Sequence, residues 1–460
     1  MSVRPFPYGR VCIFGAARSG VGAMHLLRHH NVEVVLVDER PAMEFRSLIR
    51  RLRRLYVTPF FGKPVAKESL RGCQAIIVSP GIPLTHAFVQ EAMNRGLPVI
   101  SEVELASYFA TAPIVAITGT NGKTTTTTLL GQMVADSGLN AVVSGNIGRA
   151  FSDGVLSSMQ EGRNTILVTE VSSFQLESIE EFHPHVATIL NITRDHMDRY
   201  ASMRDYIEAK YRITLNQTAS DYLVLNEDDP LTMKCAEESN AQIFTISQKK
   251  EVAQGAFVKD GIIYLAENGE AIPFCAKTEI PIPGAHNVEN TLACLVMARR
   301  IGISLESLKR TLTRFKGVEH RIEFVAEDPV RKVKYFNDSK ATNVDSLEKA
   351  LLAFEKPVVL VAGGRDKKSA YERLNSLVKS RVKGLVLIGE ARQLIRNAWG
   401  ELVPTRDAGS MEEAVKIASQ FAEAGDSVLL SPACSSFDMY KDYEERGRVF
   451  KRIVREQLGL

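Results

Sequence analysis

Residues 116–126 contain the clearest chemical signal in this chain, because their types and spacing match a phosphate-binding loop. The apolar run Ile114–Ile117 leads into a short segment with Gly119 and Gly122, and Lys123 and Thr124 follow at the start of a predicted helix. Glycines let several backbone N–H groups point at one anion, and the helix N-terminus adds partial positive charge. Lys123 is spaced to reach the β- and γ-phosphates, and Thr124 to ligate Mg²⁺. The segment predicts a nucleoside triphosphate site; the structural alternative is a glycine turn beside a chance lysine.

Two further polar segments follow predicted strands and offer metal ligands. Glu170 comes directly after the apolar run 166–169, and Asp-His-Met-Asp at 195–198 follows the run 187–192. Because an open α/β sheet binds its ligands at the carboxyl ends of its strands, Glu170 suits an Mg²⁺ site beside the phosphate loop. His196 is either a hydrogen-bonded loop residue or a member of that site.

Two predicted helices contain residues with both a structural and a chemical interpretation. Lys210 lies in a polar helix predicted over 206–213, where a solvated surface lysine is the simplest interpretation. An amphipathic helix starts at 286–290 (His-Asn-Val-Glu-Asn). Its asparagines are either helix N-caps or contacts to an adenine base.

The first hundred residues contain an imperfect dinucleotide fingerprint. A strand leads into a glycine turn from Gly15 to Gly20, and Asp38 ends the next strand. Ala17 stands where a glycine normally lets the backbone approach a pyrophosphate, so the motif supports an NAD site only weakly. It indicates either a contact to some nucleotide's ribose or phosphate, or a tight turn alone.

The last third of the chain has two polar segments that also follow strands. Asp338 and Lys340 lie in the segment 337–343 and are either an internal ion pair or ligand contacts. The segment 431–438 offers hydroxyls and backbone amides, with Tyr443 downstream. Together these groups suit a small charged substrate.

The elements that position these motifs alternate between short β-branched runs and helical patterns. That alternation predicts an α/β fold of parallel sheets covered by helices, and a length of 460 residues favours about three domains. We place the domains at residues 1–111, 112–317 and 318–460. The predicted strands are 11–14, 32–37, 75–79, 114–118, 141–144, 165–169, 186–191, 222–226, 334–337, 357–362, 384–388 and 427–431.

Composition excludes several other classes. Hydrophobic residues make up 45% and charged residues 24%, and the net charge of +3 gives no indication of nucleic acid binding. No apolar run has the length of a membrane span, and no signal segment begins the chain. The six cysteines are scattered, which predicts reduced, buried thiols in a cytoplasmic protein. The arginines of 50–54 are interpreted as a solvated helix face.

Taken together and in this order, the motifs resemble the Mur ligases, the ATP-dependent amide ligases of peptidoglycan synthesis, from about Val11 to Phe450. The phosphate loop Gly-Thr-Asn-Gly-Lys-Thr-Thr and the segment 195–198 are shared across that family and its folylpolyglutamate synthase relatives. Narrower segments resemble the branch that adds D-glutamate. These are 79–81, 172–177, 337–343, 431–434 and 444–447.

The resemblance implies a uridine-nucleotide domain, a central ATPase domain with a phosphate loop, and a C-terminal Rossmann-like domain that closes on the site. It implies ATP, two Mg²⁺ ions, UDP-N-acetylmuramoyl-L-alanine and D-glutamate as ligands, an acyl-phosphate intermediate, and catalytic roles for Lys123, His196 and Lys210. The residues that it implies for ATP are Gly119, Thr120, Asn121, Gly122, Lys123, Thr124, Thr125, Asn290, Arg321, Asp338 and Lys340, and those for metal are Thr124, Glu170, His196 and Lys210 as a carbamate. Those for the uridine part of the substrate are Ser19 and Asp38, and those for the UDP-sugar are Asn146 and Ser172. Those for D-glutamate are Lys368, Ser436, Phe437 and Tyr443. Phe437 and Tyr443 depart from the Leu and Phe that other members often have.

Three alternatives remain open from the sequence. A phosphate-loop hydrolase or kinase leaves the first 110 or so residues and the C-terminal motifs without a role. An NAD-dependent oxidoreductase depends on the imperfect Gly15 turn. A folylpolyglutamate synthase normally has its phosphate loop near the N-terminus, with no uridine-binding domain before it.

Overall fold

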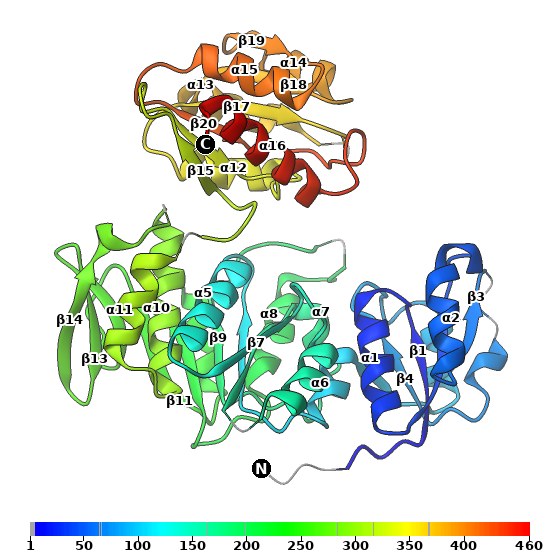
Figure 1. Ribbon diagram of the computed structural model, residues 1–460. Coiled ribbons are helices and arrows are strands. Elements are labelled where there is room, and N and C mark those ends of the chain that lie inside the picture. Colours follow the sequence, from blue (N-terminus) through cyan, green and yellow to red (C-terminus); the bar gives the residue numbers. More distant parts are fainter. Residues whose placement is uncertain are drawn as a thin grey trace. The chain divides into compact units, whose positions relative to one another are not determined.

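Three β-sheets organise the part of the chain that the computed structural model describes, which is residues 5–460 without 64, 66, 163, 198, 283, 316, 367 and 368. By their internal contacts the described residues form two compact units, one up to Ile280 with Val288–Thr313, and one of Pro281–Asn287 with Arg314–Leu460. The first unit contains two of the sheets, and the second unit contains the third (Figure 1). No helix in the described ranges combines the length and apolar character that a bilayer crossing requires.

The first sheet has the strand order β3-β2-β1-β4-β5, and all its pairings are parallel. This order is that of a doubly wound fold, and its direction reverses between β1 and β4. Leucines of α1 and α2 cover one face and Phe88 and Val89 of α3 cover the other. The elements are β1 (Arg10–Phe14), α1 (Arg18–His29), β2 (Glu33–Asp38), α2 (Arg46–Arg54), β3 (Thr58–Phe61), β4 (Ala75–Val78), α3 (Ala87–Asn94), β5 (Val99–Ser101) and α4 (Glu102–Ser107). The arginines of α2 are exposed, as predicted.

The second sheet has the order β14-β13-β12-β11-β10-β9-β6-β8-β7. Strands β6 to β12 pair in parallel, so the carboxyl ends of β8, β6 and β9 meet at one edge. The elements are β6 (Ile114–Thr118), α5 (Lys123–Asp136), β7 (Asn140–Gly145), α6 (Phe151–Glu161), β8 (Thr165–Glu170), α7 (Ser173–Leu176), β9 (Val186–Ile189), α8 (Met203–Tyr211), β10 (Tyr222–Asn226), α9 (Pro230–Met233), β11 (Gln242–Ser247), β12 (Gly255–Lys259), β13 (Ile262–Glu267), β14 (Glu270–Ala276), α10 (Ala285–Arg300) and α11 (Leu305–Arg314).

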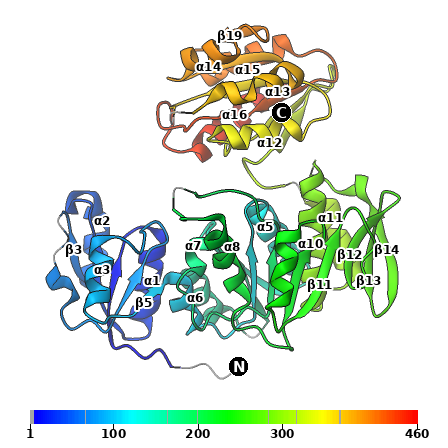
Figure 2. The ribbon, with the colours of Figure 1, turned by 180° about the vertical axis from the view of Figure 1, so that it is seen from behind.

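One part of this sheet differs from the prediction. Strands β12, β13 and β14 pair antiparallel, and they are not among the predicted strands. Short connections join these strands, and such connections permit hairpins but not parallel crossovers. The antiparallel part lies at one end of the sheet, while β7 and α6 lie at the end nearest the first sheet (Figure 2).

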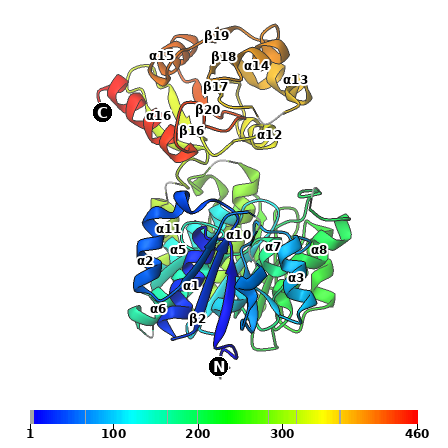
Figure 3. The same ribbon diagram turned by 90° about the vertical axis from the view of Figure 1, so that its right-hand side faces the viewer.

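The third sheet, in the second unit, has the order β15-β16-β20-β17-β18-β19. Its pairings are parallel except that β15, which is not among the predicted strands, runs antiparallel to β16. Helices α12, α13 and α14 pack on one face and α15 and α16 on the other (Figure 3). The elements are β15 (Glu323–Glu327), β16 (Lys334–Asn337), α12 (Val344–Leu352), β17 (Val358–Gly363), α13 (Asn375–Arg381), β18 (Val382–Ile388), α14 (Arg392–Trp399), β19 (Thr405–Asp407), α15 (Met411–Phe421), β20 (Ser427–Leu430) and α16 (Tyr443–Leu458).

Candidate active site

The phosphate loop follows β6, which lies between β8 and β9, and leads directly into α5. Gly119 and Gly122 have φ angles of 146° and 84°, a region that side chains with a Cβ disfavour. A Cβ on Gly122 would also overlap Oδ1 of Asn290, which is buried on α10. Asn290 lies inside the helix, so it is not an N-cap, and its amide lies against Gly122 of the loop; its contact with an adenine stays a prediction.

Asn191, which sequence reasoning did not single out, fixes the shape of this loop. Its backbone carbonyl accepts the N–H of Thr120 at 2.9 Å, and its side-chain Oδ1 accepts the N–H of Asn121 at 2.9 Å. The residue follows β9, so its position at the carboxyl end of a strand next to β6 was the available signal. Asn191 holds two loop amides, and the remaining loop geometry is set by the glycines.

Two lysines converge on the backbone carbonyls of the loop. Lys123 Nζ donates to the carbonyls of Gly119 at 2.8 Å and Thr120 at 2.9 Å, and Lys210 Nζ donates to Gly119 at 3.1 Å. Lys210 is only 1% exposed, so its interpretation as a surface lysine is wrong. Burial, and secondly the charge of Lys123, hold the pKa of Lys210 well below its usual value. Both lysine side chains therefore lie at the loop where a phosphate group is predicted to bind.

Tyr206 on α8 joins Lys210 and His196 to the loop. Its hydroxyl lies 3.0 Å from Thr120 Oγ1, and Lys210 Nζ lies 4.5 Å from the centre of its ring. The His196 ring packs edge-on at 6.2 Å from the same ring, with Phe174 at 4.7 Å on another side. His196 has a φ of 56° and a side chain that is 44% exposed, so its imidazole remains accessible to a ligand. Asp198, in the same segment, lies outside the described residues.

Glu170 has a buried carboxylate oxygen that is free to bind a metal ion. It pairs in register with Ile117 at the end of β8 and is 2% exposed. Its Oε1 accepts the amide of Asn146 at 2.9 Å, whereas Oε2 is buried and has no hydrogen-bond partner among the described residues. A buried carboxylate oxygen without a donor is costly, and an Mg²⁺ ion would satisfy it. Glu170 therefore fits the predicted metal site, whereas the role of Thr124 in it stays a prediction.

Two residues predicted to contact the UDP-sugar lie near Glu170. Asn146 donates to its carboxylate, and Ser172 comes two positions after it in the chain. The Ser172 hydroxyl caps α7 by accepting the N–H of Gln175. The guanidinium of Arg18, at the start of α1, donates to the carbonyl of Asn146 at 3.3 Å. The first sheet thus contacts the phosphate-loop domain close to Glu170.

The glycine turn of the first sheet lies at the point where the strand order reverses. Gly15 has a φ of 105°, and a Cβ on Gly20 would overlap the Gly15 carbonyl, which explains both glycines. The Asp38 carboxylate accepts the N–H of Ala16 at 2.7 Å and pairs with Arg40 at 2.9 Å. Although burial raises the pKa of Asp38, the hydrogen bonds from Arg40 and Ala16 lower it overall, so the group stays charged. Ser19 lies half-buried in the first turn of α1.

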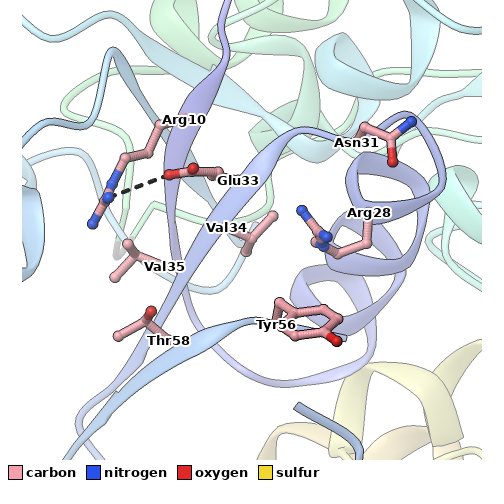
Figure 4. A pocket seen from close by; sticks show the side chains of 8 residues that line it. All are labelled: Arg10, Arg28, Asn31, Glu33, Val34, Val35, Tyr56 and Thr58. Atoms are coloured by element: carbon pink, nitrogen blue, oxygen red, sulfur yellow. Dashed lines mark hydrogen bonds and ion pairs between the residues drawn. The ribbon is translucent and has the colours of Figure 1, made fainter. Parts of the chain in front are cut away.

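A separate open hollow of about 430 Å³ lies at the other end of this sheet, where β1, β2 and β3 begin (Figure 4). Arg28 donates to the carbonyls of Leu55 and Val32, and Arg10 lies 3.3 Å from Glu33. These cations are held by groups of the protein, and the hollow is at the opposite strand ends from Gly15. It is therefore not part of the candidate site.

In the second unit, the predicted ATP contacts follow β16. The buried Asp338 carboxylate accepts the hydroxyl of Ser431 at 2.8 Å and the N–H of Ile322 at 3.3 Å. Burial raises the pKa of Asp338 to about 7. Lys340 Nζ lies 4.0 Å from the centre of the Tyr443 ring, a contact that the sequence did not predict.

Arg446 of α16 forms hydrogen bonds with both the loop after β16 and the loop after β20. Its guanidinium is 1% exposed and donates to the Ser339 hydroxyl and carbonyl and to the carbonyls of Cys434 and Ser435. Burial lowers its pKa to about 10, which still leaves it charged at neutral pH. In the loop after β20, Ser436 is buried and Phe437 is 62% exposed. Lys368, predicted for the same pocket, lies outside the described residues.

Comparisons with known proteins agree with this arrangement. The Mur ligase MurD-like N-terminal domain matches residues 9–101, the Mur ligase middle domain matches 117–298, and the Mur ligase glutamate ligase domain matches 320–434. The chain belongs to the Mur ligase family. Its three α/β domains are those that the resemblance implied, and family membership over nearly the whole chain removes the hydrolase and oxidoreductase alternatives.

Similar curated proteins extend along nearly the full chain. UDP-N-acetylmuramoylalanine--D-glutamate ligase of Thermoanaerobacter sp. (strain X514) is 42% identical over 451 residues, 97% of this chain and 98% of that protein. The enzyme of the same name from Geotalea daltonii is 43% identical over 450 residues, 98% of each. Among solved structures, UDP-N-acetylmuramate-alanine ligase from Thermotoga maritima aligns with a TM-score of 0.58 at 19% identity over 97% of this chain and 99% of that one. A pseudomurein peptide ligase type C from Methanothermus fervidus gives 0.57 at 17% identity, over 98% and 100%. At these identities the two structures show the fold alone.

Proposed function

We propose that this protein joins D-glutamate to UDP-N-acetylmuramoyl-L-alanine at the expense of ATP, as a step of peptidoglycan precursor synthesis. The observation that supports this best is the chain-long similarity, above 40% identity, to D-glutamate ligases. The loop geometry is consistent with it, since Lys123, Lys210, Tyr206 and Glu170 surround the carboxyl end of β6. The six cysteines are free thiols, which fits a reaction in the reducing cytoplasm.

The chemistry follows from the poor electrophilicity of a carboxylate. The L-alanyl carboxylate oxygen attacks the γ-phosphorus of ATP, the bond to ADP breaks, and an acyl phosphate forms. The D-glutamate amine then attacks the acyl carbon, loses a proton, and the tetrahedral intermediate expels phosphate. Phosphoryl transfer needs positioning and charge neutralisation more than covalent help from the protein. Lys123 supplies a cation to the transferring phosphoryl group, and the loop amides orient the phosphates.

Thr124, Glu170, His196 and a modified Lys210 would hold two Mg²⁺ ions. When bound, the ions neutralise charge on the phosphate oxygens. The buried Oε2 of Glu170 supports the first position. His196 is positioned against Tyr206, which also contacts Thr120 of the loop.

Lys210 is proposed to be a carbamate in the active enzyme. Its amine lone pair attacks carbon dioxide, an N–C bond forms, and one proton leaves to solvent. The amine must be neutral for this, and the burial that lowers the pKa of Lys210 favours that form. The product is an anion with two oxygens, which suits Mg²⁺ better than an ammonium does.

Residues assigned to the one reaction come from both compact units, so we also propose that the second unit closes when the ligands bind. Closure would protect the acyl phosphate from water. Small-angle scattering tests this with the UDP substrate and a non-hydrolysable ATP analogue. A smaller radius of gyration is expected, and an unchanged value with both ligands bound contradicts closure.

The decisive test of the function is a panel assay on the full chain. UDP-N-acetylmuramoyl-L-alanine and ATP are supplied with D-glutamate, L-lysine, meso-diaminopimelate or D-alanyl-D-alanine, and phosphate release is measured. Only D-glutamate is expected to support rapid turnover, because a neutral or cationic side chain would leave buried polar groups of the pocket unpaired. Equal turnover with L-lysine overturns the assignment, and L-glutamate provides the control for stereochemistry.

A further inference from the structure

A cluster of Glu319, His320, Glu323 and Lys451 in the second unit resembles a metal site but contains its own cation. One ligand atom from each of Glu319, His320 and Glu323 lies within 4.8 Å of the others. Lys451 Nζ, on α16, lies 2.6 Å from Glu319 Oε1 and 2.7 Å from Glu323 Oε1. The ammonium therefore occupies the position that a metal ion would take between the two carboxylates.

Glu323 uses its second oxygen to hold the segment that precedes it. Its Oε2 accepts the backbone N–H of His320 at 3.0 Å and the side-chain amide of Asn337 at 2.9 Å. His320 and Asn337 are 3% and 0% exposed, and they also contact each other at 2.8 Å between Nδ1 and Nδ2. Since Asn337 directly precedes Asp338, one carboxylate organises the entry to both predicted ATP segments.

The segment held in this way is strained. His320 and Ile322 have φ angles of 66° and 45°, so two residues with a Cβ on either side of Arg321 adopt the left-handed region. For β-branched isoleucine this conformation is a true outlier, and such conformations persist only where surrounding contacts impose them. Arg321 itself is exposed, so the strained backbone presents its side chain outward.

Backbone bonds extend the same support to the other segment. The N–H of Lys340 donates to the His320 carbonyl at 3.1 Å, and the N–H of Ile322 donates to Asp338 Oδ1 at 3.3 Å. A shift of His320 would therefore move Asp338 and Lys340 as well as Arg321. All three are residues that the family resemblance predicts to contact ATP.

Lys451 keeps this network charged and fixed. Its side chain is 14% exposed, compared with 54% for Glu319 and 16% for Glu323. Burial opposes the ammonium, but the hydrogen bonds and charges of the two glutamates outweigh it and raise the pKa of Lys451. Without the ammonium, two carboxylates would face each other in a poorly hydrated position and move apart.

We propose that Glu323 and Lys451 form a positioning pair for ATP, which holds Arg321, Asp338 and Lys340 in the geometry that nucleotide binding requires. The inference rests on the proposed function for the identity of the nucleotide. Neither side chain is assigned a contact with a substrate, so both act through the segments that they hold.

The test uses isosteric variants of the full chain. Lys451→Met keeps the length and packing of the side chain, and Glu323→Gln keeps its shape. Lys383→Met is the matched control, because Lys383 also bridges two carboxylates, Glu423 at 2.6 Å and Asp426 at 2.9 Å, through contacts with neither predicted ATP segment. The Michaelis constants for ATP, D-glutamate and the UDP substrate are measured for each protein, with the dissociation constant of ATP by calorimetry.

Lys451→Met and Glu323→Gln are each expected to raise the KM for ATP about tenfold, since a charged hydrogen bond contributes roughly 1.5 kcal/mol. The constants for D-glutamate and the UDP substrate should change less than about twofold. Lys451→Arg should restore most of the ATP affinity, and Lys383→Met should alter no constant.

Two outcomes overturn the proposal. One is an unchanged KM for ATP in both variants, and the other is an equal rise in all three constants, which indicates general loosening of the domain. If the unmodified protein does not use D-glutamate, the proposed function fails, but ATP calorimetry still tests the pair. Urea unfolding of each variant confirms that the folded protein is being compared.

Discussion

The phosphate-loop region and the loops after β16 and β20 occupy equivalent places, at the carboxyl ends of parallel strands, but the charged groups of Glu170, Arg446 and Asp338 are hydrogen-bonded to different extents. Around the phosphate loop, Lys123 and Lys210 both donate to one backbone carbonyl, and Glu170 Oε2 lacks a donor among the described residues. In the second unit, Arg446 is buried among four hydrogen-bond acceptors and Asp338 receives two donors.

The difference separates groups arranged for a ligand from groups arranged for the fold. Buried charge that the protein leaves uncompensated costs stability, and it persists where a ligand of opposite charge is to be bound. Buried charge that the protein compensates fully holds loops in place, and removing it leaves other groups unsatisfied. Variants in the first region should therefore lose rate and keep stability, whereas variants in the second should lose stability first.

The largest effect is expected for Lys123→Ala. Loss of a cation from the transferring phosphoryl group should lower kcat on the order of 10² or more. The KM for the UDP substrate should stay nearly unchanged, and the midpoint of urea unfolding should change little, because the Lys123 side chain is only half-buried. Phosphate-release kinetics and urea unfolding measure both. Near-normal turnover contradicts the assignment of the loop.

Lys210→Ala should also be nearly inactive while folded, but only this variant should respond to added carboxylates. Acetate or formate can occupy the oxygen positions of a lost carbamate, and partial recovery of turnover with millimolar acetate is the expected result. Lys123→Ala is the matched control, since a carboxylate cannot replace a cation. Equal responses of the two variants, or an unmodified amine in a high-resolution map of the active enzyme, exclude the carbamate.

The sequence predicted the phosphate loop, Glu170 and the three-domain α/β fold because these depend on local pattern: glycine spacing, β-branched runs and polar residues directly after them. It did not predict the burial of Lys210. The polar residues Arg204, Asp205 and Glu208 of α8 gave the helix a solvated character, and the packing of one turn over the loop is a tertiary property. The Glu323–Lys451 pair spans 128 residues, so no local pattern reports it.

Arg446→Met tests the other half of the comparison. The variant should lower the free energy of unfolding of the second unit by about 2 kcal/mol, because the carbonyls of Ser339 and Cys434 lose a charged donor. Trp399 is the single tryptophan of the chain and is buried in this unit, so its fluorescence in a urea titration reports the transition. Arg448→Met, on the exposed side of the same helix, is the control and should change less than about 0.5 kcal/mol. Equal stabilities of the two variants contradict a structural role for Arg446.

The smallest effect is a difference in pH dependence between the two units. Burial raises the pKa of Asp338 and of Glu102, which accepts the Ser152 N–H at 2.6 Å, to about 7 in each case. A carboxyl whose pKa is higher in the folded than in the unfolded protein binds more protons when folded. Its contribution to the free energy of unfolding is therefore fully present below pH 4. This contribution is lost as the pH rises to 7, at no more than about 1.4 kcal/mol per pH unit. The neutral variants Asp338→Asn and Glu102→Gln lack this term.

For each variant, the free energy of unfolding is subtracted from that of the unmodified protein. The difference isolates the contribution of the substituted carboxyl, because the contributions of the other titrating groups cancel. For Asp338→Asn the difference followed by Trp399 fluorescence should fall by about 1–2 kcal/mol between pH 5 and pH 7, since the folded carboxyl is protonated over that range. For Glu102→Gln the Trp399 signal should show no such fall, because Glu102 lies in the other unit; its pH dependence should appear in circular dichroism. A flat difference for Asp338→Asn would show that Asp338 is ionised in the folded protein. The second unit would then also contain uncompensated buried charge, and the contrast between the two regions would no longer hold.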